Sequence, residues 1–222
     1  MDTLAKRLKS TREAIQAECN RLQRAEPTLI VVTKNHPVSL AEELYSLGER
    51  DFGENRVQEA EPKAELLVEH QDLNWHLIGQ LQTNKVKQAL TFARSIHSLD
   101  RESLLVELQK RTSERENPLD VFIQVNLTDD PGRGGIEIDE VVRFADRVAA
   151  VETLHLRGLM AVASLDDDPS VDFEKVASLS QKLIVNHPQA GDLSIGMSND
   201  FLEALQFGAT HLRIGTAITG NR

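Results

Sequence analysis

The sequence predicts an α/β protein in which eight parallel strands alternate with helices and close into a (β/α)8 barrel. Short apolar segments recur along the 222-residue chain and are separated by segments of helical periodicity with brief connections. An open doubly wound sheet is the alternative, but that fold usually carries a G-x-G-x-x-G turn after its first strand, and none follows here. The length suits a compact barrel, somewhat below the typical ~250 residues.

The elements follow one another without a linker or an internal repeat, so residues 1–222 are predicted to form a single domain. An amphipathic helix over residues 3–24 comes first, because its apolar residues recur at helical spacing among charges. Strands are then predicted at residues 28–34, 50–55, 75–79, 94–99, 120–126, 154–162, 193–197 and 211–218. Helices are predicted between them at residues 38–48, 57–70, 83–90, 101–115, 138–150, 171–186 and 201–206. Pro62 is expected to kink or divide the helix over 57–70.

The first strand runs directly into Lys34, and an Asn-His-Pro turn follows at once. An unbroken apolar run indicates a strand covered on both faces, so Lys34 is expected at the carboxyl end of a buried strand. A lysine there is costly unless its amine is paired or used. One interpretation is a side chain that reaches out to solvent. The other is an amine held in a pocket, where it can form a Schiff base with a carbonyl compound.

The ends of the last two strands carry groups that suit an anion. Ser198 offers a hydroxyl at the start of a short helix, and Gly215 and Thr216 offer close backbone approach and a second hydroxyl. Barrels commonly bind phosphate at these two loops. Ser198 alone could equally be a plain helix N-cap. A strand-end lysine beside a phosphate site describes a pocket for a phosphorylated aldehyde, and pyridoxal 5′-phosphate is the obvious ligand.

The composition excludes several classes of function. A net charge of −10 argues against sequence-independent binding to nucleic acid and against an anionic membrane surface. The lone cysteine, Cys19, cannot form an intrachain disulfide and is interpreted as a packing residue. The N-terminal residues have no apolar run behind them, and no apolar stretch is long enough to span a bilayer. These features together predict a cytoplasmic protein.

Six segments, in order, resemble one known family. They are Val32-Thr33-Lys34, Phe52 to Glu59 (FGENRVQE), Trp75 to Lys85 (WHLIGQLQTNK), Gly158-Leu159-Met160, Gly196 to Asp200 (GMSND) and Arg213 to Thr216 (RIGT). Together they are similar to the YggS/PROSC family of pyridoxal phosphate homeostasis proteins. The resemblance extends over nearly the whole chain.

The resemblance implies a fold-type III barrel like the N-terminal domain of alanine racemase, with pyridoxal 5′-phosphate as its cofactor. It implies Lys34 as the Schiff-base lysine, and Ser198, Gly215 and Thr216 at the phosphate. It also implies Arg213 facing the pyridine nitrogen. Asn55 is expected among the cofactor-binding residues. His76 and Asn84 also lie in family motifs expected near the site, but His76 could instead be a satisfied histidine of the barrel interior.

Some positions depart from the family pattern and concern the rim of the site. They are Leu77, Gln80, Arg133 and Thr219. The leading hypothesis is a protein that holds pyridoxal phosphate and hands it over to apo enzymes that use this cofactor. Such a protein is expected to be a monomer or a weak dimer and to have no efficient turnover of its own.

A fold-type III amino-acid racemase is the alternative function, but a racemase needs acid–base groups on both faces of its substrate. The only tyrosine, Tyr45, is expected far from the site, and no second domain is expected after the barrel. A barrel with an unrelated phosphorylated ligand is the third interpretation.

Overall fold

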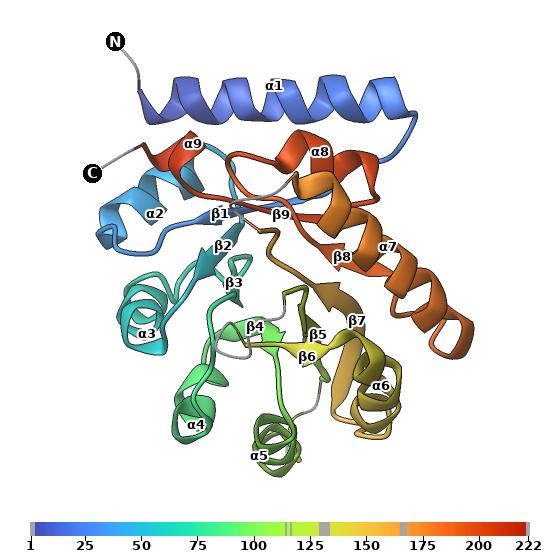
Figure 1. The fold of residues 1–222 in the computed structure, drawn as a ribbon. Coiled ribbons are helices and arrows are strands. Elements are labelled where there is room, and N and C mark those ends of the chain that lie inside the picture. Colours follow the sequence, from blue (N-terminus) through green and yellow to red (C-terminus); the bar gives the residue numbers. More distant parts are fainter. Residues whose placement is uncertain (1–2, 114, 116, 129–133, 165–167, 221–222) are drawn as a thin grey trace.

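A computed structural model of the chain describes residues 3–220, except for residues 114, 116, 129–133 and 165–167. Eight parallel strands close into a barrel, as the sequence predicts (Figure 1). These strands are β1 (Thr28–Val32), β2 (Asp51–Glu54), β3 (Asn74–Leu77), β4 (Ala93–Leu99), β5 (Leu119–Asn126), β7 (Leu154–Met160), β8 (Asp192–Ser194) and β9 (His211–Ile214). A two-residue strand, β6 (Ile136–Glu137), pairs with the carboxyl end of β5.

Two pairings close the sheet into a ring. β1 pairs with β9, and β4 pairs with β5. In the first of these pairings Leu29 lies opposite Leu212 and Val31 opposite Ile214, and all four residues are buried. Strands covered on both faces carry continuous apolar runs, which is why the run before Lys34 could be recognised in the sequence.

The helices surround the barrel and cover the outer face of its strands (Figure 1). They are α1 (Leu4–Leu22), α2 (Val38–Ser46), α3 (Val57–Leu66), α4 (Val86–Ala89), α5 (Glu102–Thr112), α6 (Val141–Ala149), α7 (Pro169–Asn186), α8 (Phe201–Gln206) and α9 (Thr216–Thr219). Two turns of 3-10 helix, η1 (Thr83–Lys85) and η3 (Ile138–Glu140), precede α4 and α6. No helix among the described residues combines the length and the hydropathy that a membrane span requires.

The N-terminal helix α1 lies across α8 and α9 (Figure 1). Its apolar face is buried, and Cys19 on that face is only 1% exposed, which confirms the prediction that this cysteine is a packing residue. Two arginines join the start of the chain to its end. Arg7 donates through Nε to the carbonyl oxygen of Ile218 at 2.7 Å, and Arg24 donates to the carbonyl oxygen of Leu205 at 2.6 Å. These contacts hold α1 against the elements that follow β8 and β9.

Several predicted boundaries are wrong. The strands predicted at residues 75–79, 154–162 and 193–197 end early, at Leu77, Met160 and Ser194. The first strand ends at Val32, so that Lys34 lies in the turn beyond it. The last strand ends at Ile214 instead of residue 218, because the backbone of Gly215 leaves the extended region (φ −109°, ψ −93°) and α9 begins. The third predicted helix ends at Leu66, and Pro62 lies inside it without dividing it. Proline removes a single helical hydrogen bond, which a short helix packed against a barrel tolerates.

Candidate functional site

A pocket of about 370 Å³ opens at the carboxyl ends of the strands. It brings together all six residues that the sequence predicts at the site: Lys34, Asn55, Ser198, Arg213, Gly215 and Thr216. The remaining lining residues are Val32, Ile78, Val162, Met197, Asn199 and Asp200. They are mostly apolar, so the pocket combines an apolar body with a few polar groups at fixed places. This is the usual character of a site for a small organic ligand.

Lys34 enters the pocket from the turn after β1. Its side chain is exposed and makes no hydrogen bond or ion pair with another residue in the described part of the chain. The expectation that Lys34 belongs to the buried strand is therefore corrected, since the buried position at the strand end is taken by Thr33. An amine without a protein partner, at the edge of an apolar pocket, is available to a ligand.

Ser198 lies opposite the start of α9. Its hydroxyl oxygen accepts hydrogen bonds from the backbone N–H groups of Gly215 at 3.2 Å and Ala217 at 3.3 Å. Ser198 is therefore not the N-cap of the next helix, α8, whose N-cap is Asp200. Backbone N–H groups at the first turn of a helix bind anions well, and here they lie beside the hydroxyl of Ser198, which accepts from them in the absence of a ligand. This end of the pocket suits a phosphate group.

Arg213 is 4% exposed and lies on the wall of the pocket formed by β9. Its guanidinium donates to the hydroxyl oxygen of Ser194 at 2.7 Å, to the carbonyl oxygen of Ser194, and to the carbonyl oxygen of Ala161 at 2.9 Å. Burial lowers the pKa of Arg213 to about 10, and Asp200 opposes that shift. The side chain is therefore still a cation at neutral pH, and it can only donate hydrogen bonds.

A chain of hydrogen bonds crosses the barrel interior behind Arg213. Its links are Arg213 to Ser194, Ser194 to His97 Nδ1 (2.8 Å), His97 Nε2 to Ser95 (2.9 Å), Ser95 to His76 Nδ1 (2.6 Å), and His76 Nε2 to Asp51 (2.9 Å). An arginine only donates and a carboxylate only accepts, so with both imidazoles neutral the two ends of the chain give every link the same direction. Each imidazole then carries its proton on Nε2 and accepts at Nδ1.

His97, at the middle of this chain, is fully buried and stacks on Phe122. Desolvation lowers the pKa of His97 well below its ordinary value, and the neighbouring histidines and Arg213 lower it further. The ring is therefore neutral, as the direction of the hydrogen bonds requires. The chain connects the pocket wall to a polar cavity of about 200 Å³ whose lining includes Asp51, at the amino end of β2.

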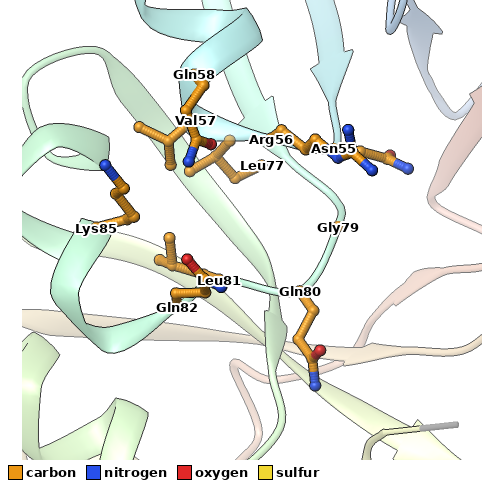
Figure 2. Close-up of a pocket in the computed structure, with 10 residues that line it drawn as sticks. All are labelled: Asn55, Arg56, Val57, Gln58, Leu77, Gly79, Gln80, Leu81, Gln82 and Lys85. Atoms are coloured by element: carbon orange, nitrogen blue, oxygen red, sulfur yellow. The ribbon is translucent and has the colours of Figure 1, made fainter.

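Asn55 follows β2 and lines two neighbouring hollows. One is the pocket described above, and the other is a smaller one of about 210 Å³, drawn in Figure 2, between the start of α3 and the segment 79–85. In Figure 2, Asn55 and Arg56 lie at one end of this hollow and Lys85 at the other. Gly79 allows this arrangement, because a Cβ atom there would lie 2.4 Å from the carbonyl oxygen of Asn55.

Two residues of the family motifs lie outside the pocket. His76 belongs to the interior chain and lines the cavity at the amino end of the barrel, so its interpretation as a satisfied interior histidine is confirmed and its expected place near the site is wrong. Asn84 is exposed on η1 and lines neither of the hollows around Asn55. The hydroxyl of Thr219, the last residue of α9, donates a 3.2 Å hydrogen bond to the carbonyl oxygen of Gly215. Arg133 lies outside the described residues.

The sequence interpretation missed the apolar walls of the pocket, Ile78, Val162 and Met197, and the carboxylate Asp200. Ile78 and Met197 stand inside the family-like segments, and Ile78 could have been found by its place directly after β3. Asp200 Oδ1 accepts a hydrogen bond from the backbone N–H of Met197 at 2.5 Å, and so orders the loop after β8.

The residues present fit pyridoxal phosphate. The pocket supplies an amine without a partner among the described residues, hydroxyl and backbone N–H groups at one end, a buried guanidinium on one wall, and apolar side chains between them. Its volume lies within the range of about 300–1,000 Å³ that is typical of sites for small organic ligands.

Comparison with known proteins agrees with this geometry. Residues 10–222 match the family described as alanine racemase, N-terminal domain. The chain is 37% identical to a pyridoxal phosphate homeostasis protein of Vibrio cholerae over 216 residues, which cover 95% of this chain and 91% of that one. It is 36% identical to the protein of the same name from Escherichia coli K12, with 100% and 98% of the two chains covered.

Solved structures show the same relationship. PipY of Synechococcus elongatus PCC7942, solved with pyridoxal phosphate bound, is 33% identical with a TM-score of 0.87, and the match covers 98% of this chain and 100% of PipY. Alanine racemase of E. faecalis shares the fold at a TM-score of 0.73 and 22% identity, and the match covers 59% of that enzyme.

The fold and the pocket thus define an alanine-racemase-like parallel barrel with a ligand site at the carboxyl ends of its strands. Within that class, the chain belongs to the family of pyridoxal phosphate homeostasis proteins. The resemblance noted in the sequence is therefore confirmed, together with the predicted fold class.

Proposed function

We propose that this protein binds pyridoxal 5′-phosphate reversibly through Lys34 and serves the homeostasis of that cofactor. The observation that carries the proposal is the pocket itself, which combines a lysine amine that has no partner in the described part of the chain with hydroxyl and backbone N–H groups suited to a phosphate and with apolar walls. The family relationship and the PipY structure with the cofactor bound support it. Bound pyridoxal phosphate supplies an aldehyde that condenses with an amine: a carbon–nitrogen double bond forms and the aldehyde oxygen leaves as water.

Each polar group of the pocket has a separate task in this proposal. Ser198, Thr216 and the backbone N–H groups at Gly215 and Ala217 hold the phosphate, and the Ser198 hydroxyl exchanges its present N–H partners for the ligand. Arg213 faces the pyridine nitrogen and donates a hydrogen bond to it. A guanidinium that is protonated at neutral pH leaves that nitrogen largely without a proton of its own. Asn55 contacts the ligand from the end of β2.

The same geometry supports a carrier more than an efficient enzyme. An unprotonated pyridine ring is a poorer electron sink, so amino-acid chemistry at the bound cofactor gains less stabilisation. Racemisation also needs a second acid–base group across the substrate. Tyr45, which could serve chemically, instead donates to Asp72 at 2.9 Å and stacks on His70, and it does not line the pocket. Besides Lys34, the ionisable lining residues are Arg213 and Asp200. Apo enzymes that use pyridoxal phosphate are the recipients in this proposal.

Covalent labelling tests the proposal directly. The protein loaded with pyridoxal phosphate should absorb visible light, and borohydride reduction followed by peptide mass mapping should place the pyridoxyl group on Lys34. Lys34→Ala should lose both the absorption and the label. Labelling confined to other lysines would contradict the assignment. Proton exchange at the α-carbon of amino acids in deuterated water, at about 1 s⁻¹ or faster and dependent on Lys34, would favour the racemase instead.

A further inference from the structure

The peptide groups on both sides of Lys34 are held by side chains from β2 and α3. On one side, Lys63 Nζ donates to the carbonyl oxygen of Thr33 at 2.9 Å. On the other side, the backbone N–H of Asn35 donates to Glu59 Oε2 at 2.9 Å. Glu59 and Lys63 lie four residues apart on α3, which places them on the same face of that helix. One helix face therefore fixes the backbone immediately before and immediately after Lys34.

Glu54, the last residue of β2, completes this arrangement. Its Oε1 atom accepts from Lys63 Nζ at 2.6 Å and from the Thr33 hydroxyl at 2.7 Å. Both members of the ion pair are buried, with side-chain exposures of 9% for Lys63 and 1% for Glu54. Thr33 is completely buried as well. We refer to Glu54, Glu59 and Lys63 below as the Lys34 clamp.

A contribution to folding stability does not by itself explain why the Glu54–Lys63 ion pair is buried. Desolvation raises the pKa of the Glu54 carboxyl, although its hydrogen bonds with Lys63 and Thr33 oppose the shift. Its second oxygen, Oε2, is buried without a hydrogen-bond partner in the described part of the chain. Buried ion pairs often contribute no more stability than apolar residues of the same size, because desolvation offsets their attraction. The pair does fix the position of the strand end.

The clamp also supports an unusual backbone conformation. Asn35 has a φ of +61°, in the left-handed region that few residues other than glycine adopt. The hydrogen bond from its N–H group to Glu59 favours this conformation and turns the chain sharply after Lys34. As a result the backbone of Lys34 is held on both sides, while its side chain projects without a partner among the described residues into the pocket.

We propose that Glu54, Glu59 and Lys63 are positioning residues that fix the backbone of Lys34, so that its amine projects into the pocket where the covalent link with the ligand forms. The inference rests on the proposed attachment of pyridoxal phosphate to Lys34. A reactive side chain on a backbone that is already ordered loses less conformational freedom when the bond forms, so the clamp strengthens covalent binding in particular. Ser198, Arg213, Gly215 and Thr216, which are proposed to hold the ring and the phosphate, come from β9 and from the segments after β8 and β9, and only Asn55 adjoins a residue of the clamp.

Two ligands separate covalent from non-covalent binding. Pyridoxal phosphate can bond to Lys34, whereas 4′-deoxypyridoxine 5′-phosphate has the same ring and phosphate with a methyl group in place of the aldehyde. The double variant Glu54→Gln/Lys63→Met removes both charges together, so that no unpaired charge remains buried. We expect its affinity for pyridoxal phosphate to fall roughly tenfold or more, while its affinity for the deoxy analogue stays within about twofold of the parent protein.

Glu59 provides a second, independent variant. Glu59→Ala removes the acceptor for the Asn35 N–H and should also weaken pyridoxal phosphate selectively. Glu59→Gln keeps an amide oxygen that can accept the same bond, so it should restore most of the loss. A merely structural role for these residues would not produce a difference between the two ligands, nor its rescue by glutamine.

A matched control comes from the other end of β2. Arg12 and Glu49 form a bidentate ion pair with both distances at 2.6 Å, and Glu49 is nearly as buried as Glu54. Arg12→Met/Glu49→Gln should lower stability without changing the ratio of the two affinities. Equal losses for both ligands in the clamp variants, or no loss for either, would overturn the proposal. In that case Lys34 would still carry the borohydride label, whereas an unlabelled Lys34 in the parent protein would overturn the proposed function itself.

Discussion

Two buried serines offer a sharp test of the hydrogen-bond chain behind Arg213. Ser194 and Ser98 both have no exposed surface. The hydroxyl of Ser194 joins Arg213 to His97, at 2.7 Å and 2.8 Å. The hydroxyl of Ser98 has no hydrogen-bond partner among the described residues. Replacing either serine by alanine removes the same single atom from a buried position, so a difference between the variants reports hydrogen bonding and not lost volume.

The expected magnitudes differ widely. Ser194→Ala removes one bond from a charged donor, although Arg213 keeps the carbonyl oxygens of Ser194 and Ala161. It also leaves Nδ1 of His97 buried without a donor, and each of these losses costs about 1–3 kcal/mol. We expect a decrease of about 2–4 kcal/mol in the free energy of unfolding, because Arg213 loses one hydrogen-bond acceptor and keeps the two carbonyl oxygens. Ser98→Ala removes a hydroxyl that is desolvated without compensation, so its effect should be about 1 kcal/mol or less, in either direction.

Urea denaturation of the two variants beside the parent protein measures these values. In a chain of this size a loss of 1 kcal/mol lowers the melting temperature by roughly 2–4 °C, so Ser194→Ala should melt about 4–16 °C lower. Thermal unfolding followed by circular dichroism is an adequate second assay. If Ser194→Ala lost no more stability than Ser98→Ala, the chain of hydrogen bonds would not exist as described, and the directional arrangement of His97 and His76 would be refuted.

The remaining predictions concern pH and phosphate. The pKa of buried His97 is lowered well below its ordinary value of ~6.5, so folding keeps His97 neutral while the unfolded chain takes up a proton. The contribution of neutral His97 to the free energy of unfolding is therefore fully present above about pH 6.5, and acidification removes it by about 1.4 kcal/mol per pH unit. In a His97→Asn variant the free energy of unfolding should depend less on pH between about pH 6.5 and 5. Ser198→Ala/Thr216→Ala should weaken pyridoxal phosphate binding about tenfold or more, since each hydroxyl bond to a charged group contributes roughly 1.5–3 kcal/mol. Unphosphorylated pyridoxal should bind the parent protein more weakly than its phosphate and should be almost insensitive to this double variant, and equal affinities of the parent protein for both compounds would contradict the phosphate site.

Much of the barrel could be predicted because parallel strands buried on both faces leave a plain signal. The apolar run before Lys34 and the alternation of strand and helix were sufficient to place all eight barrel strands. The six predicted site residues come together because the carboxyl ends of parallel strands meet at one face of the barrel. Residues that the sequence places at the ends of different strands therefore line the same pocket.

Features that depend on spatial register could not be predicted in this way. Ser95 and His97 lie on β4 and Ser194 lies on β8, and nothing in the sequence states that these strands face one another across the barrel interior. The Lys34 clamp was missed for the same reason, since Lys63 looked like an ordinary charge on a helix. The last strand was predicted too long because Thr216 to Ile218 favour a strand locally, whereas the backbone turn at Gly215 starts a helix.

The pairing of β1 with β9 has a thermodynamic consequence for the ligand site. Lys34 follows the first strand of the barrel, and Gly215 follows the last, so the pocket spans the joint where the two ends of the sheet meet. Bringing these distant segments together is the step in which the chain loses most loop entropy. A ligand that contacts both sides binds only the joined form, and it adds about 2.7 kcal/mol to the stability of that form at a hundredfold excess over its dissociation constant. Ligand binding and the pairing of β1 with β9 are therefore coupled. A higher concentration of the cofactor should lower the fraction of molecules in which these two strands are separated.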